Sequence, residues 1–184
     1  MESLFWPVGS LLAMGLGTTG FVHGFRSLRV HRLIADTPTA KVRSLAMGLV
    51  ELQGKVRARS RISAPFTNQP CAWWEVELQT LRQSGKGVKH WGTVYREQSG
   101  NPFYLEDGTG TAMVYPQGAK VGAGDVVTEE TLGLGVPEPY ASFMSGRQLG
   151  MRHIWGMGAM RFRERRIEEG RCVYVLGRAN PKPH

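Results

Sequence analysis

The chain has 184 residues, of which 41% are hydrophobic, and this fits one folded domain with an additional segment. Its 23 Lys and Arg residues outnumber 15 Asp and Glu residues, so the formal net charge is +8. Two cysteines exclude a disulfide scaffold and a structural zinc site. The chain also lacks the interleaved aromatic and basic residues of an RRM, so nucleic acid is not an expected partner.

The N-terminal segment predicts a transmembrane helix over residues 1–25. It contains no Lys or Arg, and residues 3–25 contain no Asp or Glu. A helix of residues 3–25 would be about 34 Å long, enough to cross the hydrocarbon core of a bilayer. A signal peptide and a buried core helix are the alternatives. The positive n-region and a clear cleavage site are missing, however, and most core helices are shorter.

Small residues recur at four-residue spacing in this segment. Such spacing lets helix backbones approach closely in lipid, although small residues are also simply frequent in membrane helices. The predicted packing residues are Gly9, Ala13, Gly17, Gly20 and Gly24. A second transmembrane helix or a second copy of the chain is therefore an expected partner.

Residues 26–41 are predicted to be a basic juxtamembrane helix or linker. Arg26, Arg29, Arg32 and Lys41 follow the predicted span, and no basic residue precedes it. The positive-inside rule then places the following domain in the cytoplasm as a single-pass protein.

Residues 42–179 are predicted to form a mainly β, antiparallel domain of the barrel or sandwich type, followed by a tail over residues 180–184. Short apolar runs of period two alternate with glycine-containing turns, which is typical of such folds. The clearest strand is Cys71–Gln79, where Trp74, Val76 and Leu78 share one face.

Three turns are expected to connect strand pairs. Residues 83–87 should form a hairpin turn before a strand over 91–96. Asp107-Gly108 between two apolar runs predicts a second hairpin. Residues 160–166 and 171–177 are expected to pair with each other around the turn at 168–170. Only residues 138–150 suggest a helix in the domain.

Two rows of basic residues have the two-residue period of a strand face. They are Lys55, Arg57, Arg59 and Arg61, and Arg161, Arg163 and Arg165. One interpretation is a solvated face, with Glu75 and Glu77 pairing across strands with part of the first row. The functional interpretation is a surface for anionic lipid headgroups or an acidic partner, where each well-placed cation contributes about 1 kcal/mol.

No catalytic or metal-binding constellation is evident. The five histidines show no ligand spacing with Cys, Asp or Glu, so no metal and no cofactor are expected. Asp107-Gly108-Thr109-Gly110 is similar to an aspartyl protease turn, but that chemistry needs a second such turn. Cys71 and Cys172 are expected to be buried thiols, with a disulfide as the alternative outside the cytoplasm.

Several segments in a consistent order resemble the GIDE domain, also called BAM for "beside a membrane". They are residues 36–44, 46–54, 64–65, 70–71, 74–75, 102–110 and 164–177. The resemblance covers residues 36–179 and implies a mostly β domain flanked by transmembrane helices. Eukaryotic members are mitochondrial ubiquitin ligases in which the domain lies between the membranes and a RING domain recruits the conjugating enzyme.

This chain departs from those ligases in its zinc ligands. A RING needs about eight Cys or His ligands, and the two cysteines cannot supply such a set. The expected function is therefore that of a membrane-anchored, non-catalytic binding or sensor domain. The alternative is a ligase-like or accessory protein whose transfer activity resides outside this chain. For topology the charge rule indicates the cytoplasmic side, which we keep. The resemblance to the mitochondrial ligases implies the periplasmic or intermembrane side as the alternative.

Overall fold

The computed structural model describes residues 39–85, 87–122, 125–132, 135–149 and 159–180. The predicted transmembrane helix, its five small packing residues and residues 26–38 of the linker lie outside these ranges. No helix within the described ranges is long and apolar enough to span a membrane.

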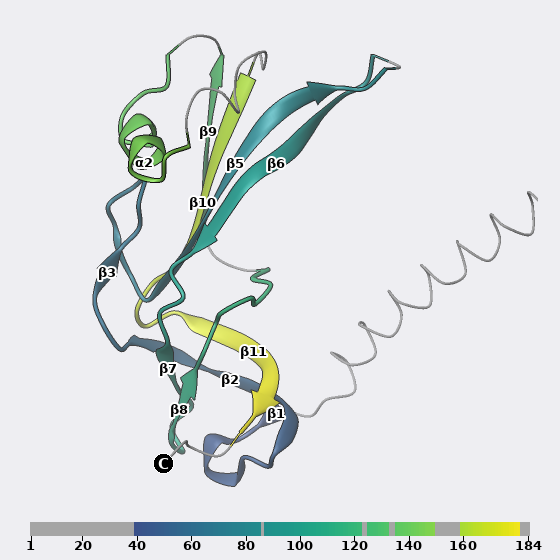
Figure 1. The fold of residues 1–184 in the computed structure, drawn as a ribbon. Helices are drawn as coiled ribbons and strands as arrows, with labels where there is room; N and C mark the ends of the chain where they lie inside the picture. Colours follow the sequence, from purple (N-terminus) through teal and green to yellow (C-terminus); the bar gives the residue numbers. More distant parts are fainter. Residues whose placement is uncertain (1–38, 86, 123–124, 133–134, 150–158, 181–184) are drawn as a thin grey trace, which may run out of the picture. The chain divides into compact units, whose positions relative to one another are not determined.

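The described chain is mainly β with curled sheets, as the sequence predicts (Figure 1). Its strands are β1 (Thr39–Ala40), β2 (Gly48–Ala58), β3 (Ile62–Ser63), β4 (Pro70–Cys71), β5 (Trp73–Gln83), β6 (Lys89–Gln98), β7 (Phe103–Glu106), β8 (Thr111–Val114), β9 (Asp125–Leu132), β10 (Ala159–Ile167) and β11 (Cys172–Ala179). A 3-10 turn, η2, spans Val42–Ser44, and the α-helix of the described residues, α2, spans Tyr140–Gly146.

Two compact units divide the chain. The described residues of the first are 39–40, 44–52 and 175–180, and those of the second are 41–43 and 53–174. Because strand β1 already begins at Thr39, the β structure starts earlier than the linker boundary predicted at residue 41.

The strands form three sheets. One has the order β1-β2-β7-β8 with β11 also paired to β2, the second has the order β6-β5-β10-β9, and the third is the short pair β3-β4. The expectation of a purely antiparallel domain is wrong at one place, because β1 pairs with β2 in parallel through Thr39 opposite Glu51. Strand β9 has no counterpart among the sequence predictions.

Two of the three predicted hairpins are confirmed. β5 and β6 pair in antiparallel across the turn that follows Gln83, and β7 and β8 pair across the Asp107–Gly110 turn. The third prediction is wrong, because β10 pairs with β5 and β9 whereas β11 pairs with β2. The intervening turn joins β2 instead: Gly170 N donates to Val56 O at 2.7 Å, and Val56 N donates to Arg171 O at 2.8 Å.

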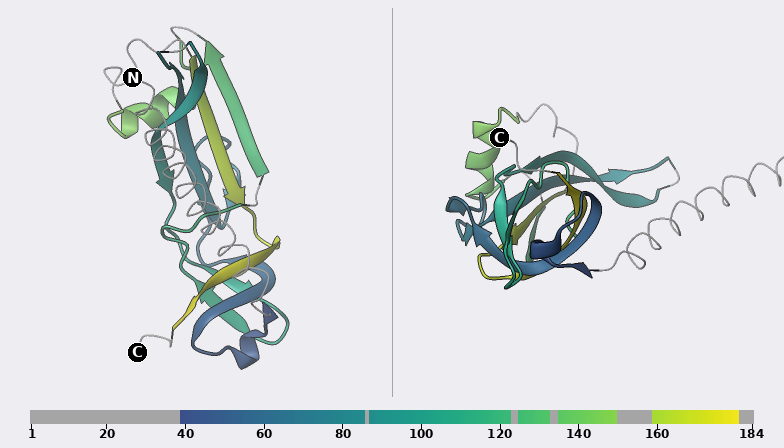
Figure 2. Two further views of the ribbon diagram at one scale, coloured as in Figure 1. Left: turned by 90° about the vertical axis from the view of Figure 1, so that its right-hand side faces the viewer. Right: turned by 90° about the horizontal axis from the view of Figure 1, so that it is seen from below.

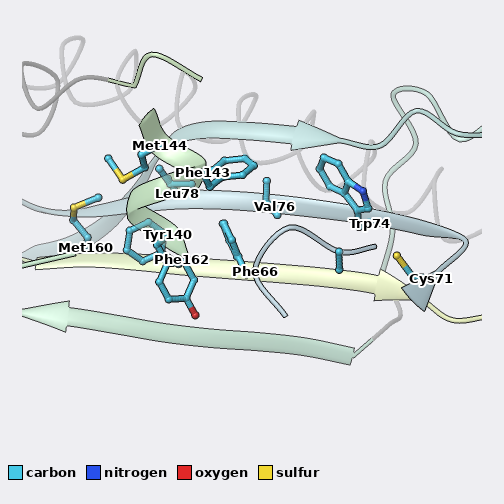
Figure 3. Packing of buried hydrophobic residues seen from close by; sticks show 11 residues of the cluster. Phe66, Cys71, Trp74, Val76, Leu78, Tyr140, Phe143, Met144, Met160 and Phe162 are labelled. Carbon is cyan, nitrogen blue, oxygen red and sulfur yellow. The ribbon is translucent and has the colours of Figure 1, made fainter. Parts of the chain in front are cut away.

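Helix α2 covers one face of the β6-β5-β10-β9 sheet (Figures 1 and 2). Its aromatic residues Tyr140 and Phe143 pack around Phe66, with ring centroids 4.8 and 5.1 Å from the Phe66 ring (Figure 3). The buried cluster consists of Ala64, Phe66, Cys71, Trp74, Val76, Leu78, Tyr140, Phe143, Met144, Met160 and Phe162. The predicted shared face of Trp74, Val76 and Leu78 is thus confirmed as a core face, and α2 confirms the helix predicted within residues 138–150.

A buried carboxylate supports this core. The Glu164 side chain lies on the apolar face of β10 and its residue is only 1% exposed. Its Oε2 accepts hydrogen bonds from Phe66 N at 2.6 Å and Thr67 N at 3.3 Å, while Oε1 accepts from the Thr67 hydroxyl at 2.5 Å. Because these bonds satisfy both carboxylate oxygens, Glu164 fixes the 64–67 segment against the sheet.

Asp107 fixes the β7–β8 turn to η2. Its Oδ1 accepts hydrogen bonds from the Thr109 backbone N at 2.8 Å and hydroxyl at 2.7 Å, and from Gly110 N at 3.2 Å. Its Oδ2 accepts from Val42 N at 2.8 Å. These donors, led by the Thr109 hydroxyl, hold the Asp107 pKa far below its ordinary value. The carboxylate therefore has a structural partner for each oxygen.

Candidate functional site

Three arginines of β10, Arg161, Arg163 and Arg165, lie on the sheet face opposite α2, and two of them meet glutamates of β5. We call these three the β10 arginines. The register places Arg163 opposite Glu77 and Arg165 opposite Glu75, and both ion pairs have N–O distances of 3.7 Å. Arg161 pairs instead with Glu130 of β9 at 2.6 Å. Its guanidinium also lies 4.0 Å from the centroid of the Trp91 ring, a cation–π contact.

The two β5 glutamates are buried and have further partners on β6. Both residues are 4% exposed. Arg96 donates to Glu77, and Gln98 donates to Glu75 with an N–O distance of 2.7 Å. Buried carboxylates need such paired donors, because an unpaired one would lose its hydration without compensation. The β10 arginines are therefore engaged within the sheet, with exposed side-chain fractions of 26, 29 and 27%.

These contacts change the pairing expected for Glu75 and Glu77. The sequence interpretation assigned them to the row of cations on β2, whereas in the structure they pair with the row on β10. A signal for the correct pairing was present in the sequence. Glu75 and Glu77 are two residues apart, as are Arg163 and Arg165, and such equal spacing of opposite charges is typical of neighbouring antiparallel strands.

The basic row that begins on β2 has a different environment. Lys55 and Arg57 point outward, and Val56 between them is only 2% exposed. Strand β2 ends at Ala58, so the prediction that one strand carries the whole row is wrong for Arg59 and Arg61. Both residues are nevertheless exposed directly after the strand.

Only one cation of this row has an ion pair among the described residues. Arg57 binds Glu106 of β7 with an N–O distance of 2.9 Å, and this hydrogen bond raises the Arg57 pKa. Lys55, Arg59 and Arg61 have no ion pair within the described ranges. We call Lys55, Arg57, Arg59 and Arg61 the β2 cationic row. It presents exposed positive charge that the β10 arginines do not.

The two cysteines lie in different environments. Cys71 is buried in the core, where desolvation and the nearby Glu164 carboxylate raise the pKa of its thiol to about 11. Such a thiol stays protonated near neutral pH and is a poor nucleophile. Cys172 is exposed, so the expectation of two buried thiols is wrong for this residue. Its place on the outer face of edge strand β11 explains the exposure.

The described residues contain no cluster of three or more His, Cys, Asp or Glu that could hold a metal ion.

The comparison with family models gives a direct result: residues 75–184 match the model of GIDE, described as an E3 ubiquitin ligase. This match covers more than half of the chain.

The chain belongs to the GIDE family. The resemblance noted from the sequence for residues 36–179 is thereby confirmed over residues 75–179, while the segments before residue 75 that also carry it lie outside the matched range. No curated protein and no solved structure gives a significant match to the chain. Of the features described above, the paired arginines of β10 fall within the GIDE match and the β2 cationic row precedes it.

Proposed function

We propose that this GIDE-family protein is a membrane-anchored, non-catalytic binding domain whose β2 cationic row contacts an anionic lipid surface. The observation that carries the proposal is the contrast between the two basic rows. The β10 arginines are part-buried and paired with carboxylates, whereas Lys55, Arg59 and Arg61 are exposed and have no ion pair within the described part of the chain. Exposed cations beside a membrane attract anionic headgroups with about 1 kcal/mol each.

Membrane anchorage in this proposal rests on the uncharged segment at residues 3–25. The basic residues Arg26, Arg29 and Arg32 that follow it support placement of the domain on the cytoplasmic side. Anchorage would keep the domain close to the bilayer, so a weak electrostatic contact would suffice for a high local occupancy.

Vesicle binding tests the lipid contact. A fragment of residues 39–180, with strand content checked by circular dichroism, is titrated with neutral vesicles and with vesicles containing phosphatidylserine. We expect binding only to the anionic vesicles, and we expect it to weaken as salt rises because the charges are exposed. Equal affinity for both vesicle types would refute the proposal.

A second candidate function follows from the description of the family as an E3 ubiquitin ligase. The chain contains only two cysteines, so in this case transfer activity would reside in a partner and the GIDE domain would act as an accessory. A ubiquitin-transfer assay with the purified chain, an activating enzyme and a panel of conjugating enzymes separates the two functions. Ubiquitin chains formed without any added ligase would contradict the non-catalytic function.

A further inference from the structure

A short apolar segment at the start of β2 is exposed to solvent. Residues 45–50, with the sequence Leu-Ala-Met-Gly-Leu-Val, carry no polar side chain. Met47 is 66% exposed and Leu49 is 52% exposed. Single exposed apolar residues are normal on a protein surface, but several in succession mark a contact surface.

Strand β11 adds a third apolar residue to this surface. β11 pairs with β2, and Leu176 on β11 is 42% exposed. Gln53 Nε2 lies 3.7 Å from Cys172 Sγ, so these two side chains share one face of the β2-β11 pair. Leu49 and Leu176 are each four residues away along their own strands, and the two-residue period of a strand places them on that same face. Met47 lies just before the strand and two residues from Leu49 in the chain. We call Met47, Leu49 and Leu176 the apolar patch.

The chain connection limits how far the apolar patch can lie from the predicted membrane helix. All three residues belong to the first compact unit, which also contains β1. Thirteen residues, 26–38, separate the end of the predicted helix from Thr39 at the start of β1. Even when fully extended, this connection reaches at most about 45 Å. If the N-terminal segment spans the bilayer, Thr39 stays within this distance of it. Thr39 pairs with Glu51, two residues from Leu49, so Leu49 lies close to the end of this connection.

The exposed cation beside the patch also fits a membrane surface. Arg178 follows Leu176 by two residues on β11 and is exposed, so it shares the outer face. Glu51, two residues after Leu49 on the same face, is part-buried and accepts a hydrogen bond from the Thr39 hydroxyl at 3.5 Å. An arginine beside apolar side chains suits the bilayer interface, because its stem covers apolar surface while its guanidinium contacts headgroups.

From these observations we infer that the apolar patch inserts into the headgroup region of the bilayer to which the chain is anchored. This inference rests on the anchorage part of the proposed function. It adds an apolar contact that is independent of lipid charge, whereas the β2 cationic row requires anionic lipid. The patch would thus fix the orientation of the first unit at the membrane surface.

Site-specific fluorescence tests the insertion in the full chain. In a Cys172→Ser background, where the remaining Cys71 is buried, Leu49→Cys and separately Met47→Cys are labelled with the environment-sensitive dye NBD. Val88→Cys serves as the matched control, because Val88 is 63% exposed and belongs to the second unit. The labelled proteins are reconstituted into vesicles of neutral phosphatidylcholine with and without a doxyl group near the headgroup.

If the patch is inserted, the emission maximum of the probe at residues 47 and 49 should shift to the blue. The doxyl lipid should also quench these probes at least about twofold more than the probe at residue 88, because interfacial groups lie about 5–10 Å deep. Equal quenching at all three sites would overturn the inference. Probes at residues 47 and 49 that are protected from quenching by aqueous iodide but are not quenched by the doxyl lipid would also overturn it. That result would indicate that a second copy or another protein covers the patch. Vesicle flotation separates the two proposals: a chain that floats with unquenched probes refutes only the insertion, whereas a chain that does not float refutes the anchorage itself.

Discussion

Removal of the Glu164 carboxylate should destabilise the domain strongly. Its oxygens accept three hydrogen bonds from Phe66 and Thr67, and two of the donors are backbone N–H groups. Hydrogen bonds to charged groups contribute about 1.5–3 kcal/mol each but are not additive. Since Glu164→Ala leaves the Phe66 N–H buried without this acceptor, we expect a loss of about 3–5 kcal/mol, a large part of the total stability of an ordinary domain.

Glu164→Gln distinguishes the lost charge from the lost acceptors. The amide oxygen can still accept from both backbone N–H groups, and the amide nitrogen can donate to the Thr67 hydroxyl oxygen. Because charge-assisted hydrogen bonds are about twice as strong as neutral ones, we expect this variant to lose about half as much stability as Glu164→Ala.

Urea denaturation of the full chain in detergent, followed by fluorescence of the buried Trp73 and Trp74, measures these differences. For Glu164→Ala the midpoint should fall by about 2 M, given an m-value of about 2 kcal/mol/M. Glu169→Gln changes a nearby exposed glutamate and should leave the midpoint almost unchanged. An unchanged midpoint in Glu164→Ala would refute the reasoning about the buried carboxylate.

Three further predictions concern the second unit. Gly54→Ala would place a Cβ 2.6 Å from the Glu106 carbonyl oxygen, so we expect a loss of about 1–3 kcal/mol in urea denaturation, and wild-type stability would contradict this close approach. Asp107→Asn should lower the free energy of unfolding at neutral pH. The Asp107 pKa is lowered in the folded state, so the carboxylate stabilises the fold only while it is ionised. The difference from wild type should therefore shrink as the pH falls below the ordinary Asp pKa of 3.8. A pH series of unfolding midpoints tests this, and a constant difference at every pH would refute it. Iodoacetamide should label Cys172 in the native protein and Cys71 only after denaturation, whereas mass spectrometry showing rapid native labelling of Cys71 would contradict its burial.

The sequence predicted the local elements well because their signals are local. The alternation of Trp74, Val76 and Leu78 identified the core face of β5, and Asp107-Gly108 identified the β7–β8 hairpin. Which strands pair at long range is not encoded in such patterns. The run from β10 to β11 has the appearance of a hairpin, yet the two strands belong to different sheets because Gly170 and Arg171 hydrogen bond to Val56 of β2.

The same limit applied to the candidate site. A two-residue period correctly predicted that Lys55 and Arg57 face outward, but it could not show which basic row has acidic partners. That distinction depends on β5 lying between β6 and β10, where Glu77 meets Arg96 on one side and Arg163 on the other. The burial of Glu164 could have been predicted from the sequence. It is an even number of residues from Met160 and Phe162, so it lies on their face of β10 and not on the face of Arg161, Arg163 and Arg165.

The contribution of the β2 cationic row to lipid binding is the central claim, and a charge-matched comparison tests it most directly. One variant of the 39–180 fragment changes to Gln the three members of the β2 cationic row that have no ion pair in the described structure, Lys55, Arg59 and Arg61. The control changes three exposed cations elsewhere, Arg82, Lys89 and Lys120, so both variants carry the same net charge. At about 1 kcal/mol per cation, the first variant should lose on the order of 100-fold in partitioning to phosphatidylserine vesicles, and the control should lose far less. Equal losses in the two variants, or none in the first, would contradict the account.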